Sequence, residues 1–287
     1  MNPFENSTEE LVRHIDSHLR LDVDLATTVL TGFVANEVEK VGFSRSVVAL
    51  SGGIDSALSL AISARALGPS NVLAVMMPYR TSNPASQGDA EELIAELGVH
   101  SKVIDITPIA DPYLERYDLG NVRRGNVMAR VRMTVLYDQS EEFHGLVIGT
   151  SNKTELLLGY GTIHGDIASA INPLGDLFKT QVRQIAHTLD LPRAIIEKVP
   201  SADLWEGQQD EEELGFTYDD LDRLLYLLID ERWLPTEIIG AGIDPAFVDK
   251  ILLRVRRNQF KRRPSVIAKI SERTIEREFR YPRDWGI

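Results

Sequence analysis

The chain has 287 residues, of which 43% are hydrophobic and 26% are charged, the balance of an ordinary globular protein. Its formal net charge of −12 argues against general nucleic-acid binding. The absence of cysteine excludes disulfides, thiolate zinc sites, iron–sulfur clusters and a cysteine nucleophile within the chain. No apolar run approaches the roughly 18 residues of a membrane helix, and the polar N-terminus is unlike a signal peptide. We therefore expect a cytoplasmic protein without a membrane segment.

Two helices are predicted at the start of the chain. Ser7 and Glu10 have the spacing of a capping box. Apolar residues then recur about every four positions, first at Leu11, Ile15 and Leu19, and again at Leu25, Val29, Phe33 and, near the end, Val38. The apolar residues of terminal helices serve either a core or a subunit contact, and the pattern alone leaves both roles open.

Strands and helices alternate in the next part of the chain. The predicted strands are 47–50, 72–77, 102–106 and 146–148, and the predicted helices between them are 57–64, 89–97 and 125–137. Such alternation implies parallel strand pairing with helices covering the sheet. With right-handed crossovers, the predicted fold class is α/β, with a doubly wound parallel sheet covered by helices.

The chain beyond Thr150 is richer in loops and helices. Residues 200–215 are polar, acidic and punctuated by glycine, which is typical of a mobile loop, and Asp210 to Glu213 within them are interpreted as a solvated acidic run. Further helices are predicted at 179–189, 218–229, 235–240 and 245–257. Because no clean linker interrupts the pattern, we predict one domain over residues 1–287 with helical N- and C-terminal extensions.

A serine- and glycine-rich loop follows the first predicted strand: Ser51, Gly52, Gly53, Ile54, Asp55 and Ser56, here called the SGGIDS loop. Ligands of open α/β sheets bind beyond the carboxyl ends of strands, and the N–H groups at a helix start attract anions. Asp55 beside a phosphate is unfavourable unless a divalent cation lies between them, so the loop predicts Mg²⁺ together with phosphate. The simpler interpretation is a serine-capped glycine turn. Neither GxxxxGK[ST] nor a GxGxxG after a strand is present.

The SGGIDS loop resembles the pyrophosphate-binding loop of the N-type ATP pyrophosphatases, a superfamily of adenine nucleotide alpha hydrolase-like fold. The resemblance implies cleavage of ATP between its α and β phosphates with adenylation of an oxygen atom. The superfamily includes GMP synthetase, asparagine synthetase, tRNA-modifying enzymes and NAD synthetase, and the loop alone does not distinguish them.

Later segments resemble NAD synthetase in order and spacing. They are GNVMARVRM at 125–133, GTSNKTE at 149–155, LFKTQV at 177–182 and PSADL at 200–204, with a weaker match in KRRP at 261–264. The resemblance, which runs from about Ser46 to Leu214, implies a ligase of NAD biosynthesis. This ligase amidates deamido-NAD to NAD with ATP and ammonia through an adenylated intermediate, releasing AMP and pyrophosphate. It also implies a homodimer with the dinucleotide lying across the subunit interface.

The same resemblance implies roles for individual residues. Asp55 and Glu155 match the magnesium ligands, and Asp55 and Lys179 are the predicted catalytic residues, with Lys179 balancing charge on the departing pyrophosphate. The SGGIDS loop matches the pyrophosphate cradle, while Thr150, Lys179 and Ser201 match other ATP contacts and Arg130, Asp166 and Lys261 match deamido-NAD contacts. Ile163, Ala170 and Phe260 stand where some members of the family have polar residues.

The nitrogen source follows in part from the composition. Glutamine-dependent relatives carry an amidohydrolase domain with a cysteine nucleophile, and this chain has no cysteine. We therefore predict no glutaminase within the chain and the use of ammonia, either free or supplied by a partner. Six basic residues between Arg254 and Arg263 fit dinucleotide phosphates better than RNA in so acidic a chain, so no nucleic-acid partner is predicted.

Two other interpretations stay open at this point. A different ATP pyrophosphatase, either an amidase or a tRNA-modifying enzyme, would explain the SGGIDS loop but not the later motifs. A non-catalytic adenine-nucleotide binding module would explain a phosphate loop but needs no pair of magnesium carboxylates. Residues 200–215 are expected either to close over the intermediate as a lid or to be an ordinary exposed loop.

Overall fold

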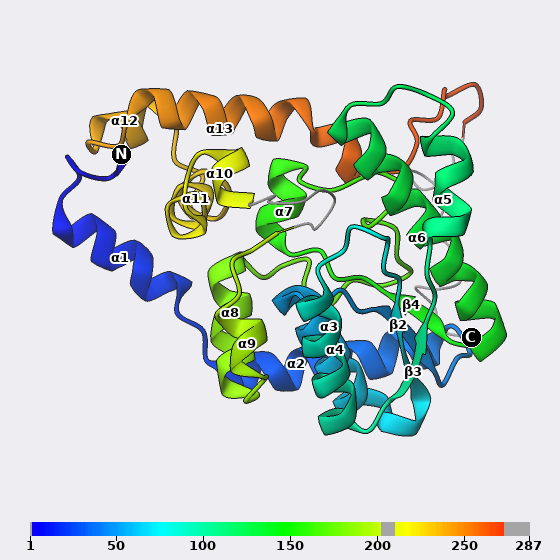
Figure 1. The fold of residues 1–287 in the computed structure, drawn as a ribbon. Coiled ribbons are helices and arrows are strands. Elements are labelled where there is room, and N and C mark those ends of the chain that lie inside the picture. Colours follow the sequence, from blue (N-terminus) through cyan, green and yellow to red (C-terminus); the bar gives the residue numbers. More distant parts are fainter. Residues whose placement is uncertain (1, 202–209, 273–287) are drawn as a thin grey trace.

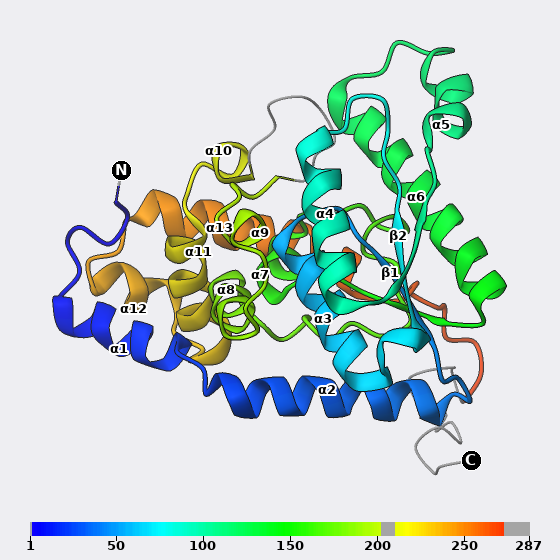
Figure 2. The ribbon, with the colours of Figure 1, turned by 60° about the horizontal axis from the view of Figure 1, so that its bottom comes forward.

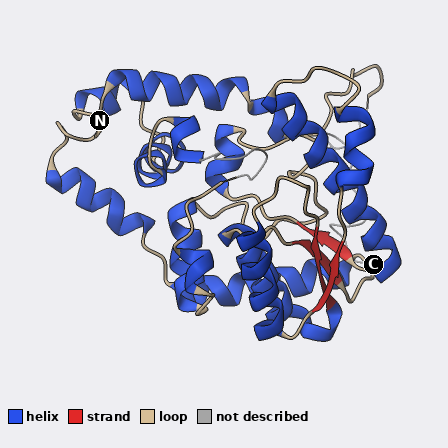
Figure 3. Ribbon diagram, in the orientation of Figure 1, coloured by secondary structure: helices blue, strands red, loops and turns tan. Residues whose placement is uncertain are grey.

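Four strands form one parallel sheet in the computed structural model, which describes residues 2–201 and 210–272 (Figure 3). The strand order is β3-β2-β1-β4. Chain connections therefore run in opposite directions from β1, and the ends of β1 and β4 flank a crevice where open α/β sheets bind ligands. The strands are β1 (Ser46–Ala49), β2 (Val72–Met76), β3 (His100–Val103) and β4 (Leu146–Ile148).

Helices cover both faces of this sheet, as predicted (Figure 2). Successive strand residues point to opposite faces, so Val48 joins one core cluster and its neighbour Val47 joins the other. The Val48 cluster is completed by α2 (Val23–Lys40), α3 (Ile54–Leu67), α4 (Pro84–Leu97) and α8 (Lys179–Thr188). The Val47 cluster is completed by α5 (Thr107–Leu114) and α6 (Asn121–Phe143).

A third core cluster lies among helices beside the sheet, on the left of Figure 1. Segments far apart in the chain meet there, because Phe4 packs its ring edge-on against Phe247. The helices of this part are α1 (Glu9–Leu19), α7 (Lys153–Leu158), α10 (Asp210–Leu214), α11 (Tyr218–Leu225), α12 (Pro235–Gly240) and α13 (Pro245–Arg257). Shorter helical turns are α9 (Arg193–Ile196), η1 (Pro69–Asn71), η2 (Tyr226–Asp230) and η3 (Gln259–Arg262).

Helix boundaries follow the sequence signals unevenly. The predictions at 235–240 and 245–257 are confirmed at the same bounds, since a proline begins each helix. The predicted cap at Ser7 is wrong, because Thr8 accepts the Leu11 N–H with its hydroxyl at 3.2 Å while the Ser7 N–H is bonded to Phe4 O. α4 and α6 extend well beyond the predicted 89–97 and 125–137, and α4 begins at a Pro that follows a capping Asn83.

The strand predicted at 102–106 is placed too late in the chain. β3 runs from His100 to Val103, and all four of its residues are exposed because it lies at the edge of the sheet. Its register with β2 ends where Val103 pairs with Met76, the last residue of β2. An edge strand held by backbone bonds needs no apolar side chains, so the apolar residues at 103–106 indicated the wrong segment.

α2 buries a different face from its most regular apolar series. Leu25 and Val29 are 61% and 59% exposed, and Phe33 is exposed as well, whereas Val34 and Val38 are fully buried. The helix faces the core through positions one residue away from the regular repeat. Among residues 2–201 and 210–272, no helix has the length and apolarity needed to cross a membrane. The extent of one domain over residues 1–287 stays a prediction.

Candidate active site

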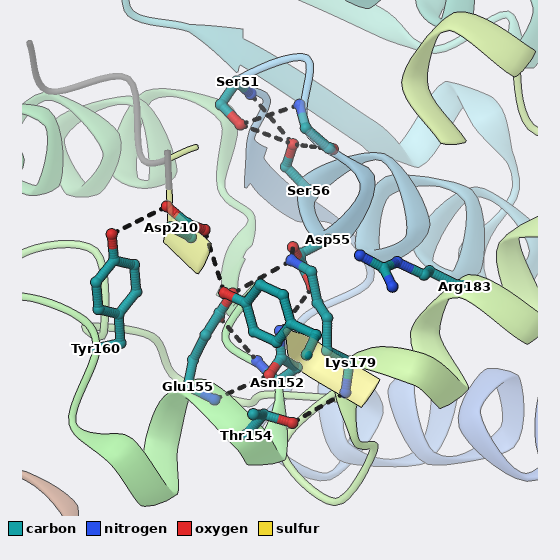
Figure 4. Close-up of polar contacts among 12 residues, drawn as sticks. Ser51, Asp55, Ser56, Asn152, Thr154, Glu155, Tyr160, Lys179, Arg183 and Asp210 are labelled. Carbon is teal, nitrogen blue, oxygen red and sulfur yellow. Dashed lines mark hydrogen bonds and ion pairs between the residues drawn. The ribbon is translucent and has the colours of Figure 1, made fainter. Parts of the chain in front are cut away.

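The SGGIDS loop joins β1 to α3 at the crevice between β1 and β4. Gly52 has φ +78°, and a Cβ there would clash with the carbonyl oxygen of Ser86. The Ser56 hydroxyl accepts the Ser51 N–H at 3.2 Å and donates to Gly53 O at 2.9 Å, which closes the loop on itself (Figure 4). Gly53 is the N-cap of α3 and supplies no side-chain acceptor to the first turn of that helix. The loop therefore presents backbone N–H groups at a helix start, a favourable place for an anion.

Lys198, a lysine outside the predicted set, contacts this loop and also lines the cavity beside it. Lys198 Nζ donates to Gly52 O at 3.3 Å, to Ser86 Oγ at 2.8 Å and to Asp89 Oδ2 at 2.8 Å. It thus ties the loop to α4. The contact also links the phosphate loop to the segment that leads into Ser201.

Lys179 brings the two predicted magnesium ligands together. Its ammonium group forms an ion pair with Asp55 Oδ2 and a second one, at 3.4 Å, with Glu155 Oε1. The Lys179 side chain is 3% exposed, and the two carboxylates are 17% and 16% exposed. The three groups come from the first turns of α8, α3 and α7, which converge on one point (Figure 4). The structure therefore brings these three predicted site residues together, while their roles stay predictions.

The electrostatics of this cluster indicate a shortage of positive charge. Burial, together with the Asp55 charge, raises the pKa of Glu155 to about 8 in spite of Lys179. Burial opposes the charged form of Lys179, but Asp55 and Glu155 outweigh it and raise the pKa of the ammonium group. Two carboxylates that share one lysine are a donor set that suits Mg²⁺, a hard cation that prefers oxygen ligands. The residues present therefore fit a divalent cation at this point.

Asn152 organises both carboxylates, a role that the sequence analysis missed. Its amide Nδ2 donates to Asp55 Oδ1 at 2.8 Å, and its Oδ1 accepts the Glu155 N–H at 2.9 Å as the N-cap of α7. Glu155 Oε2 in turn accepts the Asn152 N–H at 3.3 Å, completing a capping box. One oxygen of Glu155 is thus held by its own helix while the other faces Lys179. The Asn-x-x-Glu spacing was the signal that could have revealed this.

The prediction of a solvated acidic run is wrong for Asp210, although Glu212 and Glu213 are exposed. Residues 210–214 form α10, and Asp210 is only 4% exposed. Asp210 accepts hydrogen bonds from the hydroxyls of Tyr160 at 2.9 Å and Tyr218 at 3.1 Å. Two tyrosines bury one side of the run beside the Lys179 cluster, which composition could not indicate. Residues 202–209 of the predicted mobile loop lie outside the described part of the chain.

A cavity of about 1280 Å³ opens beyond these groups. That volume exceeds the usual range of about 300–1,000 Å³ for small-molecule pockets, so it has room for more than one nucleotide unit. Met76, Met77 and Pro78 line it after β2. Of the predicted site residues, those that line it are Ser51, Gly53, Ile54, Asp55, Ser56, Thr150, Glu155, Asp166, Lys179, Ser201 and Lys261.

Two of the predicted contact residues do not line this cavity. Gly52 is packed against the Ser86 backbone on the side where a Cβ would lie, and Arg130 is exposed on α6. Arg132, two residues further along α6, lines the cavity instead and donates from Nε to Met77 O at 3.0 Å. The divergent positions Ile163, Ala170 and Phe260 are not among the lining residues either, and Phe260 is 61% exposed.

Lys261 reaches the cavity wall as part of a set of side chains that cap α7. Its Nζ donates to Gly159 O and Gly161 O at 2.7 Å each. Arg262 donates to Leu156 O and Leu157 O of the same helix. The basic segment near the end of the chain thus binds the carbonyl end of α7, where the helix dipole favours cations. Asp166 lies in the adjoining loop and accepts the Thr162 N–H at 2.9 Å.

Comparison with known proteins identifies the family to which this arrangement belongs. The sequence model of the family described as NAD synthase matches residues 26–265. An NH(3)-dependent NAD(+) synthetase of Trichlorobacter lovleyi is 55% identical over 271 residues, which are 94% of this chain and 99% of that protein.

Two solved structures have the same fold over most of this chain. The NH3-dependent NAD synthetase of Campylobacter jejuni, in complex with the nitrate ion, has a TM-score of 0.75 and 36% identity and covers 87% of this chain and 100% of its own. The NMN synthetase of Francisella tularensis has a TM-score of 0.78 and 30% identity, covering 88% and 100%. The interpretations as a tRNA-modifying enzyme and as a non-catalytic module are thereby set aside. The chain belongs to the NAD synthase family.

Proposed function

We propose that this member of the NAD synthase family amidates deamido-NAD to NAD with ammonia and ATP, at the cavity beside the SGGIDS loop. The observation that carries the proposal is the convergence of Asp55, Glu155 and Lys179 at the end of a phosphate-binding loop. Two carboxylates and a lysine beside the phosphates of a nucleotide are suited to catalysing nucleotidyl transfer as well as to binding. The reaction is inferred from membership of the family, and the geometry supports the roles proposed for individual residues.

In the first step, an oxygen of the nicotinate carboxylate attacks the α-phosphorus of ATP. The bond from that phosphorus to the bridging oxygen breaks, and pyrophosphate leaves with the electron pair. Lys179 stabilises the charge that gathers on the leaving oxygens, while the N–H groups of the SGGIDS loop hold the β and γ phosphates. Thr150 and Ser201 are the proposed contacts at the α-phosphate and ribose end of ATP.

In the second step, ammonia attacks the carbonyl carbon of the acyl-adenylate. The bond from that carbon to the AMP oxygen breaks, and the nitrogen loses one proton to give the amide of NAD. Because water competes with ammonia for this carbonyl, the site must position one nucleophile and exclude the other.

Asp55 and Glu155 are the residues proposed to hold Mg²⁺. When bound, Mg²⁺ would neutralise part of the phosphate charge. It would also supply positive charge to two carboxylates that otherwise share a single lysine.

The acceptor is proposed to occupy the side of the cavity lined by Asp166 and Lys261. Lys261 is already bound to two carbonyls there, so it would present a fixed charge rather than a mobile one. Arg130 is exposed on α6 outside the cavity lining. Its proposed contact with deamido-NAD therefore requires the dinucleotide to extend beyond the cavity.

A homodimer in the cytoplasm is the proposed working state. α2 carries the exposed apolar residues Leu25, Val29 and Phe33 on one face, and a Cβ at the neighbouring Gly32 would meet no atom within 4 Å. An uncharged stripe along an 18-residue helix can pack against its own copy in a two-fold contact. Sedimentation of wild type and of Phe33→Glu tests this assignment, since a dimer built on this face should dissociate in the variant.

The reaction is tested by mixing the protein with ATP, Mg²⁺ and deamido-NAD, adding either ammonium or glutamine, and measuring NAD and AMP. NAD formed with ammonium but not with glutamine is the expected result. Nicotinate mononucleotide serves as the competing acceptor, because the Francisella relative is described as an NMN synthetase. If AMP forms only with the mononucleotide, the mononucleotide rather than deamido-NAD is the substrate. Absence of AMP with every acceptor would overturn the proposal.

A further inference from the structure

The helix that carries Lys179 has no side-chain acceptor at its N-cap position, although Gln181 Oε1 of its first turn accepts the Phe178 N–H at 2.9 Å. Phe178 occupies the N-cap position of α8, and its side chain has no hydrogen-bond acceptor. The first N–H groups of a helix have no partner within the helix, so a buried helix start needs acceptors from elsewhere. Both Phe178 and Lys179 are buried, at 1% and 2% exposure.

The acceptors come from two other helices. Thr154 Oγ1 of α7 accepts the Lys179 N–H at 3.0 Å, and Asp222 Oδ2 of α11 accepts the Thr180 N–H at 2.8 Å. The Thr154 hydroxyl then donates to Asp222 Oδ1 at 2.5 Å. One carboxylate therefore joins α7, α8 and α11 directly beneath the cluster of Lys179, Asp55 and Glu155.

Asp222 is an expensive residue to keep in this place. It is fully buried, with 0% exposure, and the partners named above are a hydroxyl and a backbone amide rather than a cation. Burial raises its pKa to about 6, although the hydrogen bonds from Thr154 and Thr180 act in the opposite direction. A buried carboxylate without a charged partner destabilises the fold unless its hydrogen bonds replace the lost hydration.

We propose that Asp222 is a positioning residue, which fixes the first turn of α8 so that the Lys179 ammonium group lies between Asp55 and Glu155. The inference rests on the role proposed above for Lys179. Only a carboxylate can accept from Thr154 and Thr180 at the same time. An asparagine would direct an N–H₂ group at one of them and leave the Thr154 hydroxyl or the Thr180 amide without an acceptor.

The test is a double-mutant cycle in the full-length protein. Asp222→Asn should lower kcat for NAD formation about tenfold, with a much smaller change in KM for ATP, because Lys179 acts mainly on the transition state. Lys179→Met alone should lower kcat further. In the double variant, kcat should equal that of Lys179→Met, since Asp222 acts through the missing ammonium group. If the loss of kcat in the double variant equals the product of the two single losses, Asp222 has only a structural role and the proposal is overturned.

Two further variants separate positioning from folding. Asp219→Asn is the matched control, because Asp219 lies on the same helix, is 58% exposed and pairs with Arg183 of α8 at 3.5 Å away from the first turn. It should leave kcat within about twofold of wild type. If Asp222→Asn does not fold, Thr154→Val removes the same relay, and Thr154→Ser should restore most of the lost kcat. Equal kcat in the Val and Ser variants would contradict the relay, whereas full activity of Lys179→Met would remove the proposed function of Lys179 itself.

Discussion

Asn152 and Asp55 are 97 residues apart in the chain, yet the amide of Asn152 donates to Asp55 Oδ1 at 2.8 Å. The other end of the same amide caps the helix that carries Glu155. Both proposed magnesium ligands are thus oriented by one neutral side chain. This arrangement holds both partly buried carboxylates beside Lys179.

Asn152→Asp tests that arrangement while preserving the helix cap. Asp is as good an N-cap as Asn, so α7 should keep its stability, but the donor to Asp55 is lost and a third negative charge appears. We expect kcat to fall about tenfold and the thermal midpoint to fall as well, because the new carboxylate is fully buried against Asp55. Steady-state kinetics across a Mg²⁺ titration, with thermal unfolding of the same samples, gives the answer. A large loss of stability with unchanged kcat would assign Asn152 to folding alone.

Lys179→Met removes the cation that Asp55 and Glu155 share. Loss of one member of a buried ionic cluster leaves uncompensated charge, so we expect a destabilisation of about 3 kcal/mol without metal. Added Mg²⁺ should reduce the difference in unfolding free energy between Lys179→Met and wild type, because a ligand that binds only the folded state stabilises it. Urea unfolding with Mg²⁺ and with a chelator measures both effects. Equal stability of the two proteins under chelation would mean that the lysine contributes no net stabilisation.

Gly52→Ala should weaken ATP binding by distorting the SGGIDS loop. Gly52 has φ +78° and abuts the backbone of Ser86, whereas Gly68 has φ +82° with open space around its missing Cβ. Gly68→Ala is therefore a matched control for backbone strain alone, at about 1 kcal/mol. We expect Gly52→Ala to lose more stability than the control and to raise KM for ATP, which the control should leave unchanged. Similar behaviour of the two variants would exclude the clash with Ser86 as the cause.

Asp222 should make stability depend on pH between about 4 and 6. Its pKa is raised from 3.8 to about 6 in the folded state, so the folded protein binds more protons than the unfolded chain in this window. The free energy of unfolding should then fall as pH rises through the window, by as much as about 3 kcal/mol from this one group. Asp222→Asn lacks this contribution. The difference in unfolding free energy between variant and wild type, measured at pH 4 and pH 7, should therefore shift in favour of the variant at pH 7.

Local signals accounted for most of the framework. Alternating apolar strands and helical repeats predicted the α/β fold, and the prolines that begin α12 and α13 set those helices to the residue. Local signals failed where the tertiary structure chose between equivalent patterns. The exposed series Leu25, Val29 and Phe33 has the same period as a core face, and only packing shows that Val34 and Val38 are the buried positions.

Some residues of the candidate site could be predicted from the sequence, and others could be found only in the structure. The SGGIDS loop was apparent from its own residues, whereas Glu155 and Lys179 were selected because the motifs that contain them resemble those of NAD synthetase. Asn152 in its contact with Asp55, Asp222 beneath α8, and Asp210 between two tyrosines were not, since each depends on partners from distant segments.

By itself, the sequence determined the parallel α/β class, the phosphate loop and the residue types available for magnesium and phosphate chemistry. Those features follow from periodicity and from side chains a few positions apart. The tertiary structure alone decided which carboxylates are buried, which amide and hydroxyl groups hold them, and which apolar face remains on the surface. Burial and hydrogen-bond partners are set by contacts between helices far apart in the chain, and no short-range pattern encodes those contacts.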